Sequence, residues 1–141
     1  MATECSNHFK YQLAKGEIDL DVDTVKICLM ATAFSFDKDA HAVWGDVSAS
    51  ELATGNGYTQ DTKTLANVVI TEDDTNDRVN VTWDNAVWTA SGGSIGPTPG
   101  AILYDDSSAD DTIIGFLDFT TERTAADGGT FTVSNIIFRI A

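Results

Sequence analysis

The sequence has few basic residues and few histidines, and each shortage excludes a class of protein. Eight lysines and arginines stand against 22 aspartates and glutamates, which gives a formal net charge of −14 at pH 7. Binding to nucleic acid or to an anionic membrane depends on lysine and arginine contacts with phosphates, so we expect neither as a partner. The two histidines have no cysteine or histidine neighbours at a spacing typical of a zinc site.

Cysteine and long apolar runs are also scarce. Two cysteines are too few for a disulfide framework, and nothing in their spacing supports a bridge between them. Cys28 lies in the apolar run VKICLMA, so we expect it to be a small core residue. No apolar stretch reaches the roughly 18 residues of a membrane-spanning helix, and the N-terminus MATECSNHFK lacks the apolar segment of a signal peptide. We therefore expect a soluble product made in the cytoplasm.

Length and composition fit one globular domain. The chain has 141 residues, of which 43% are hydrophobic and 21% charged. A chain of this length buries about two-thirds of its unfolded surface, so it needs no metal or disulfide to be stable. We predict a polar N-terminal arm over residues 1–7 and a single β domain over residues 8–141.

Alternating apolar and polar side chains, the pattern of half-buried β-strands, recur at intervals of about ten residues. Residues 25–31 are apolar on both faces, which predicts a central strand. The pattern indicates an all-β fold, mainly antiparallel and sandwich-like or barrel-like. The expected strands cover residues 17–23, 25–31, 64–71, 78–83, 86–90, 101–104, 112–119, 130–133 and 135–140.

A short helix is expected near the N-terminus. Ser6 or Asn7 can cap it, and Gly16 can end it. The apolar residues of this segment also alternate as in a strand, but its good helix formers favour the helix.

Turn-forming residues separate the expected strands. Residues 37–58 are irregular and include a GNG turn, and two acidic segments, 72–77 and 105–111, read as loops. The first of these loops should join its flanking strands as a hairpin, and the Asp-Gly-Gly sequence at 127–129 is a second hairpin signal. Gly115, inside an expected strand, indicates a bulge or a close approach of another backbone.

Residues 92–96, GGSIG, match the G-x-S-x-G pattern of the α/β-hydrolase nucleophile elbow. That motif requires a helix directly after the serine. Pro97 and Pro99 follow instead, and another β run comes after them, so we predict a loop between strands and no catalytic Ser94.

Aspartates at positions 19, 21 and 23 resemble the opening of an EF-hand calcium loop. Thr24 stands where the loop needs glycine, and Met30 stands where it needs glutamate, so the segment is not an EF-hand. Solvated carboxylates are the favoured interpretation. The alternative is an irregular calcium site that these residues share with acidic side chains from the later loop, namely Asp105, Asp106, Asp110 and Asp111.

No other pattern assembles a catalytic, metal or cofactor site, and we predict that the protein is not an enzyme. Carboxylate pairs for glycoside hydrolysis need a cleft with sugar-stacking aromatics, which a domain this small rarely builds. Core packing is the expected use of at least one of Trp83 and Trp88, whereas Trp44 lies in an irregular segment. The expected partner contacts are Trp44, Tyr58, His8 and Phe9.

Three stretches resemble small virion proteins of tailed double-stranded DNA bacteriophages. SNHFKYQLAKGEIDLDVDTVKICLM resembles their start, VTWDNAVWTASGGSIGPTPGAILYDD their middle, and TIIGFLDF with DGGTFTVSNIIFRI their final strands. The resemblance covers more than half of the chain and brings no catalytic motif with it. It implies a β-rich structural subunit, most plausibly a capsid decoration or cement protein; the alternatives are a tail, neck or fibre component, or a module that binds host-surface glycans.

The resemblance also implies partners and a location. The major capsid protein or other virion proteins would be the partners, the chain would form a homo-oligomer with a trimer favoured, and the protein would reside on the virion. A cement protein stabilises the assembled shell because it binds neighbouring subunits only there. The polar arm over residues 1–7 would become ordered on a neighbour.

Overall fold

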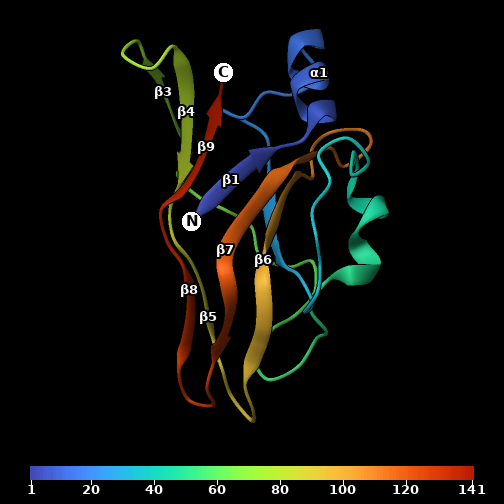
Figure 1. Ribbon diagram of the computed structural model, residues 1–141, viewed down its shortest axis with the longest axis vertical. Helices are drawn as coiled ribbons and strands as arrows, with labels where there is room; N and C mark the ends of the chain where they lie inside the picture. Colours follow the sequence, from blue (N-terminus) through green and yellow to red (C-terminus); the bar gives the residue numbers. More distant parts are fainter.

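A computed structural model describes residues 1–141 as nine β-strands with one α-helix and two short 3₁₀ turns (Figure 1). The strands form three antiparallel sheets, which confirms the predicted all-β fold with a short N-terminal helix. No helix is long and apolar enough to cross a membrane. In chain order the elements are β1 (Ala2–Cys5), α1 (Asn7–Lys15), β2 (Val25–Leu29), η1 (Trp44–Asp46), η2 (Ser48–Ser50), β3 (Val69–Asp73), β4 (Arg78–Trp83), β5 (Ala86–Thr89), β6 (Ile95–Asp105), β7 (Ile113–Ala125), β8 (Thr130–Val133) and β9 (Ile136–Ile140).

The largest sheet has the strand order β1-β7-β6-β2. Its centre is the long β6–β7 pair, which the acidic turn after Asp105 connects. Alternation places Ala101 and Leu103 of β6 on one face and Ile102 and Tyr104 on the other. Both faces are apolar, so both must be covered.

A long two-stranded ribbon covers one of these faces. Its upper part pairs β4 with β9 and its lower part pairs β5 with β8, while β3 extends the upper part as an edge strand (Figure 1). Trp83 pairs with Ile136 and Ala86 with Val133, so the register continues across the break between the two parts. The ribbon and the four-stranded sheet enclose the main core as the two layers of a sandwich.

The irregular segment 31–58 covers the other face of the sheet. Trp44, at the start of η1, and Val47, between η1 and η2, pack in a second apolar cluster with Ile102 and Tyr104. The four-stranded sheet is therefore buried on both sides.

The predicted helix is confirmed at both ends. The Ser6 hydroxyl accepts a hydrogen bond from the backbone N–H of His8, and Gly16 ends the helix in the left-handed conformation. Phe9 is fully buried in the main core, so the helix closes one end of the sandwich.

The predicted strand over residues 17–23 is wrong. The carbonyl of Asp19 accepts the N–H groups of Val22 and Asp23, and the Asp23 carboxylate accepts the N–H of Asp19. These local bonds form a tight turn because aspartate side chains offer the backbone an alternative to a ladder. The alternation predicted burial only in part: Ile18 and Leu20 are buried, but Val22 is 74% exposed.

The interpretation of residues 25–31 is right about burial and wrong about position. Residues 25–29 form β2, which lies at the edge of its sheet and not at its centre. Loop backbone replaces a neighbouring strand, since Ile27 donates its N–H to the carbonyl of Lys63 and Leu65 donates to Val25. The edge is thereby shielded from pairing with another chain.

The glycine- and proline-rich segment is a loop only up to Ser94; from Ile95 onwards it is a strand, not the predicted loop. β6 begins at Ile95 and includes Pro97 and Pro99, with a cis peptide bond before Pro97. Its pairing with β7 is irregular there, and β2 reaches no further than Ala101 on the other side. Prolines are tolerated because this part of β6 has one free edge.

Of the two predicted hairpins, the structure contains the first and not the second. The hairpin between β3 and β4 is confirmed, although the strand starts at Val69 and extends through Asp73. Residues 126–129 form a turn, but β8 pairs with β5 and not with β7, so the second predicted hairpin is wrong. Strand β7 also extends six residues past the predicted end at Phe119, to Ala125.

The N-terminal arm is part of the main sheet. Residues 2–5 form β1, which pairs with β7 from Ala2 opposite Asp118 to Cys5 opposite Gly115. Gly115 confirms the predicted close approach, because a Cβ atom there would lie 2.1 Å from the carbonyl oxygen of Glu4.

Candidate functional site

Three of the four predicted partner contacts are buried, and that part of the prediction is corrected. Phe9, Trp44 and Tyr58 belong to the apolar clusters, with 0%, 7% and 2% of their surface exposed. Trp44 lies against the sheet because residues 31–58 must cover an apolar face, even though they contain no strand. His8 alone remains partly exposed, and its Nε2 lies 2.8 Å from the Asp110 carboxylate.

Tyr58 belongs to a buried polar cluster that the sequence did not reveal. Its hydroxyl donates to Glu51 Oε1 at 2.7 Å and accepts the N–H of Leu29 at 2.9 Å. The same Glu51 oxygen accepts the N–H of Asp61. Burial raises the pKa of Glu51, and its hydrogen bonds offset part of that rise. These bonds attach the irregular segment to β2, so the cluster has a structural role.

A second polar cluster lies beside the first, around Lys26. The Lys26 ammonium lies 3.5 Å from the Asp61 carboxylate and 3.3 Å from that of Asp106. The Tyr104 hydroxyl donates to Asp61 as well, and Trp44 stacks on the Tyr104 ring. Lys26, the only basic group of this cluster, thus pairs with two carboxylates.

The two acidic segments considered for calcium do meet. Thr24 donates its N–H to the Ser107 hydroxyl, and Asp106 donates to the carbonyl of Thr24. Asp105 is fully buried; its Oδ1 accepts two backbone N–H groups, whereas its Oδ2 has no donor. Burial, with the Asp23 carboxyl group in hydrogen-bonding reach, raises the pKa of Asp105 to about 7.

A protonated Asp105 can donate a hydrogen bond to Asp23, which accounts for the otherwise unpaired oxygen. No group of three or more acidic, histidine or cysteine side chains is arranged to hold a metal ion. The two segments therefore form a hydrogen-bonded pair of turns.

Ser94 has none of the partners that a nucleophilic serine requires. It lies between the turn at Gly92 and Gly93 and the start of β6, so no helix follows it. His8 contacts Asp110, and His41 accepts the N–H of Asp37 through Nδ1. The carbonyl of Ser94 accepts a hydrogen bond from the Asn56 side chain, which fixes the segment in place.

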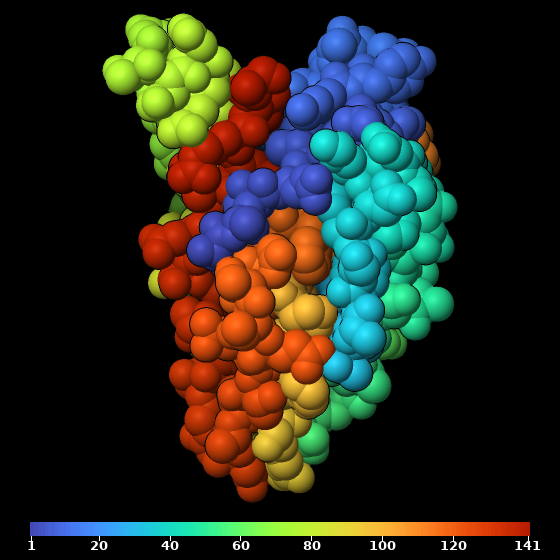
Figure 2. Space-filling view, viewed as in Figure 1, coloured from blue at the N-terminus to red at the C-terminus, as the bar shows by residue number.

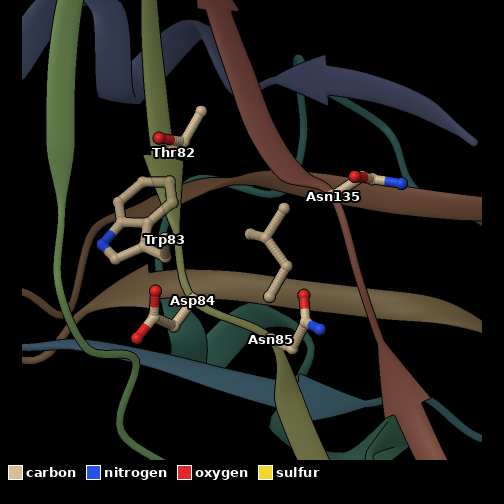
Figure 3. Close-up of a pocket in the computed structure, with 6 residues that line it drawn as sticks. Thr82, Trp83, Asp84, Asn85 and Asn135 are labelled. Carbon is tan, nitrogen blue, oxygen red and sulfur yellow. The ribbon is translucent and has the colours of Figure 1, made fainter.

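An open hollow of about 550 Å³ lies where the ribbon is interrupted (Figure 3). Asp84 and Asn85, from the crossing between β4 and β5, line it together with Asn135, from the crossing between β8 and β9. Figure 3 shows these polar side chains around the hollow, with Trp83 at its wall. The arrangement offers carboxylate and amide groups beside an aromatic ring, and it contains no nucleophile paired with a base.

The β3–β4 hairpin leaves most of β3 exposed. Its tip projects from the body on the side opposite α1 (Figure 2). Val69 and Ile70 of β3 are 53% and 43% exposed, and the outer edge of β3 has no backbone partner. Asp73 stabilises the tip, because the Asn76 and Arg78 side chains donate hydrogen bonds to its carboxylate and lower its pKa.

Sequence reasoning missed the exposure of this hairpin. The sequence predicted only a strand at Val69 and Ile70, and its position outside the sandwich leaves both side chains exposed. No signal in the sequence marks the Glu51–Tyr58 hydrogen bond, since the chain between those residues is irregular.

No protein-family model, no curated protein and no solved structure matches this chain.

Proposed function

We propose that the chain is a structural protein of a bacteriophage virion, most specifically a decoration or cement protein that binds the outside of the capsid. The three stretches that resemble small phage virion proteins motivate this proposal. The major capsid protein is the proposed partner, and the strongly acidic surface would keep decorated particles apart.

One observation carries the structural part of the proposal. The side chains that suggested chemistry are used within the fold, while an unpaired edge strand, β3, projects on an exposed hairpin. Ser94 has no base beside it, and the buried Asp105 accepts backbone N–H groups of its own turn. A rigid domain with a projecting strand suits a protein whose task is to bind a neighbour and not to transform a substrate.

Mixing the purified chain with undecorated capsids tests the proposal. We expect saturable binding at a fixed number of copies per capsid, density on the outer surface in particle images, and a higher temperature of capsid disruption. Capsids that bind no protein, or particles that carry it only at the tail, would overturn the decoration role.

A second candidate function is binding of a host-surface glycan by a tail or fibre component. The hollow at the ribbon break favours it, because Asp84, Asn85 and Asn135 offer hydrogen-bonding groups near Trp83. Such a site would lose glycan binding in Asp84→Ala and Asn135→Ala variants. A glycan array on which the wild-type chain binds nothing would remove this alternative.

A further inference from the structure

The N-terminal strand fills only half of a gap between the two layers. β1 pairs with β7 on one side and lies against β9 on the other (Figure 1). Its pairing ends at Ala2, opposite Asp118, whereas β7 continues to Ala125. Beyond Met1, the lower part of β7 therefore has no strand on its outer edge.

Strand β8 faces this edge and is also unpaired on that side. It pairs only with β5, and no backbone hydrogen bond joins it to β7. The space between them is an open groove of about 570 Å³, with Phe119, Phe131 and Val133 among its apolar lining residues. Two free strand edges on either side of a groove that contains apolar side chains form an acceptor for an added strand.

The groove has a charge opposite to that of the chain as a whole. Two of the three arginines, Arg123 and Arg139, line it, and no aspartate or glutamate does. Neither arginine forms an ion pair within the chain. In a molecule with a net charge of −14, this is a site for an acidic ligand.

The chain itself contains a segment with the required properties. β3 has a free edge, two exposed apolar side chains in Val69 and Ile70, and acidic residues at its end. Glu72 and Asp74 form no ion pair within the chain, so they are free to contact arginine.

We propose that β3 of one copy adds to the free edge of β7 in the groove of a second copy. Backbone hydrogen bonds would extend the four-stranded sheet, Val69 or Ile70 would cover the apolar side chains of the groove, and Glu72 and Asp74 would pair with Arg123 and Arg139. The contact uses different surfaces on the two copies, so it is head-to-tail and closes into a ring when the rotation permits. It goes beyond the proposed function, because it stands whether or not the chain binds a capsid.

A second copy explains the groove better than another acidic partner does. The same chain presents both a basic, strand-deficient groove and an acidic, unpaired strand. Each of these exposes backbone groups that a single copy leaves unpaired within its own sheets.

Analytical ultracentrifugation of the purified chain, untagged at its N-terminus and in moderate salt, tests the contact. We expect concentration-dependent association, weakened by at least about tenfold in Arg123→Glu/Arg139→Glu. Glu72→Lys/Asp74→Lys should weaken it similarly. Combining all four substitutions should restore association, because the charges of strand and groove are then exchanged.

The matched control is Lys10→Glu/Lys15→Glu, which changes the net charge by the same amount as the arginine pair but lies on the exposed side of α1. It should leave association unchanged. All six positions are at the surface, and circular dichroism checks that each variant folds.

Three outcomes would overturn the proposal. The first is a monomer at every concentration. The second is association that the control reduces as strongly as the arginine pair does. The third is a charge exchange that fails to restore association. A monomer whose binding to capsids depends on Arg123 and Arg139 would also overturn the contact between copies, and would assign the groove to the capsid subunit instead.

Discussion

Trp44 lies flat on Tyr104, with the two ring centroids 5.0 Å apart and the ring planes 5° from parallel. Tyr104 belongs to β6 and faces the second apolar cluster, so this stack attaches the irregular segment 31–58 to the sheet. The segment is therefore a packed layer that contains no strand of its own.

Replacing Trp44 by alanine should destabilise the fold severely. The substitution removes the stack on Tyr104 and leaves a cavity against the sheet, which costs about 3–5 kcal/mol for a buried tryptophan. Urea unfolding measures the change. Val87→Ala, at a side chain that is 43% exposed, is the control and should have a small effect. Equal stability of Trp44→Ala and wild type would contradict the burial described above.

Tyr58→Phe should destabilise the protein by about 1–3 kcal/mol, because it leaves the Leu29 N–H and one bond of the Glu51 carboxylate without a partner. The loss of this hydrogen bond should raise the pKa of Glu51 further. Tyr11→Phe provides the control, since Tyr11 is 57% exposed. Equal destabilisation by both substitutions would argue against the buried cluster.

Asp105 should make stability depend on pH near neutrality. Its folded-state pKa is about 7, against about 3.9 in an unfolded chain, so between these values the folded chain binds a proton that the unfolded chain has released. The contribution of Asp105 is fully present below the unfolded pKa and is lost as the pH rises through 7.

Asp105→Asn provides the test of this linkage. Asparagine keeps the acceptor for the Ser107 and Ser108 N–H groups and can donate to Asp23 at any pH. The variant should therefore be more stable than wild type at about pH 8.5, and the difference should shrink towards about pH 5. Asp77→Asn, on the exposed hairpin turn, is the matched control. If the stabilities of wild type and Asp105→Asn changed with pH in parallel, the proton shared by Asp105 and Asp23 would be refuted.

Gly115→Ala should displace β1. The added Cβ atom would lie 2.1 Å from the Glu4 carbonyl oxygen and 2.4 Å from the Phe138 ring, so the strand or the core must shift, at a cost of about 1–3 kcal/mol. Hydrogen exchange should show faster exchange in residues 2–5 than in the rest of the sheet. Gly45→Ala is the matched control, since a Cβ atom there meets nothing within 4 Å. Unchanged protection of β1 would contradict the close approach.

Local signals predicted local structure well. Ser6 and Gly16 specified the helix ends, and Gly115 indicated a close backbone approach, because caps and close approaches depend on a few neighbouring residues. Alternation predicted which side chains are buried more reliably than it predicted pairing. It identified Ile18 and Leu20 as buried but could not detect that aspartate side chains close a turn there.

Position in the sheet could not be predicted from the chain itself. β2 is an edge strand, yet the two apolar clusters bury both of its faces, and loop backbone from residues 52, 63 and 65 covers its free edge. The prediction of Trp44 and Tyr58 as partner contacts was wrong for the same reason. Both residues lie in irregular sequence, and only the tertiary structure decides that such a segment covers a sheet. The exposure of Val69 and Ile70 likewise depends on the position of the β3–β4 hairpin outside the sandwich.

The pairing of β1 with β7 has a consequence for the order of folding. Ala2 lies opposite Asp118, so the first strand of the chain has no partner until most of the polypeptide has left the ribosome. The lower part of the ribbon is delayed in the same way, because β5 cannot pair until Val133, the partner of Ala86, has been synthesised. Contacts between residues so far apart in sequence slow folding, since a long loop must close before any pairing stabilises it. The sandwich can therefore be completed only after β8 and β9 have been synthesised.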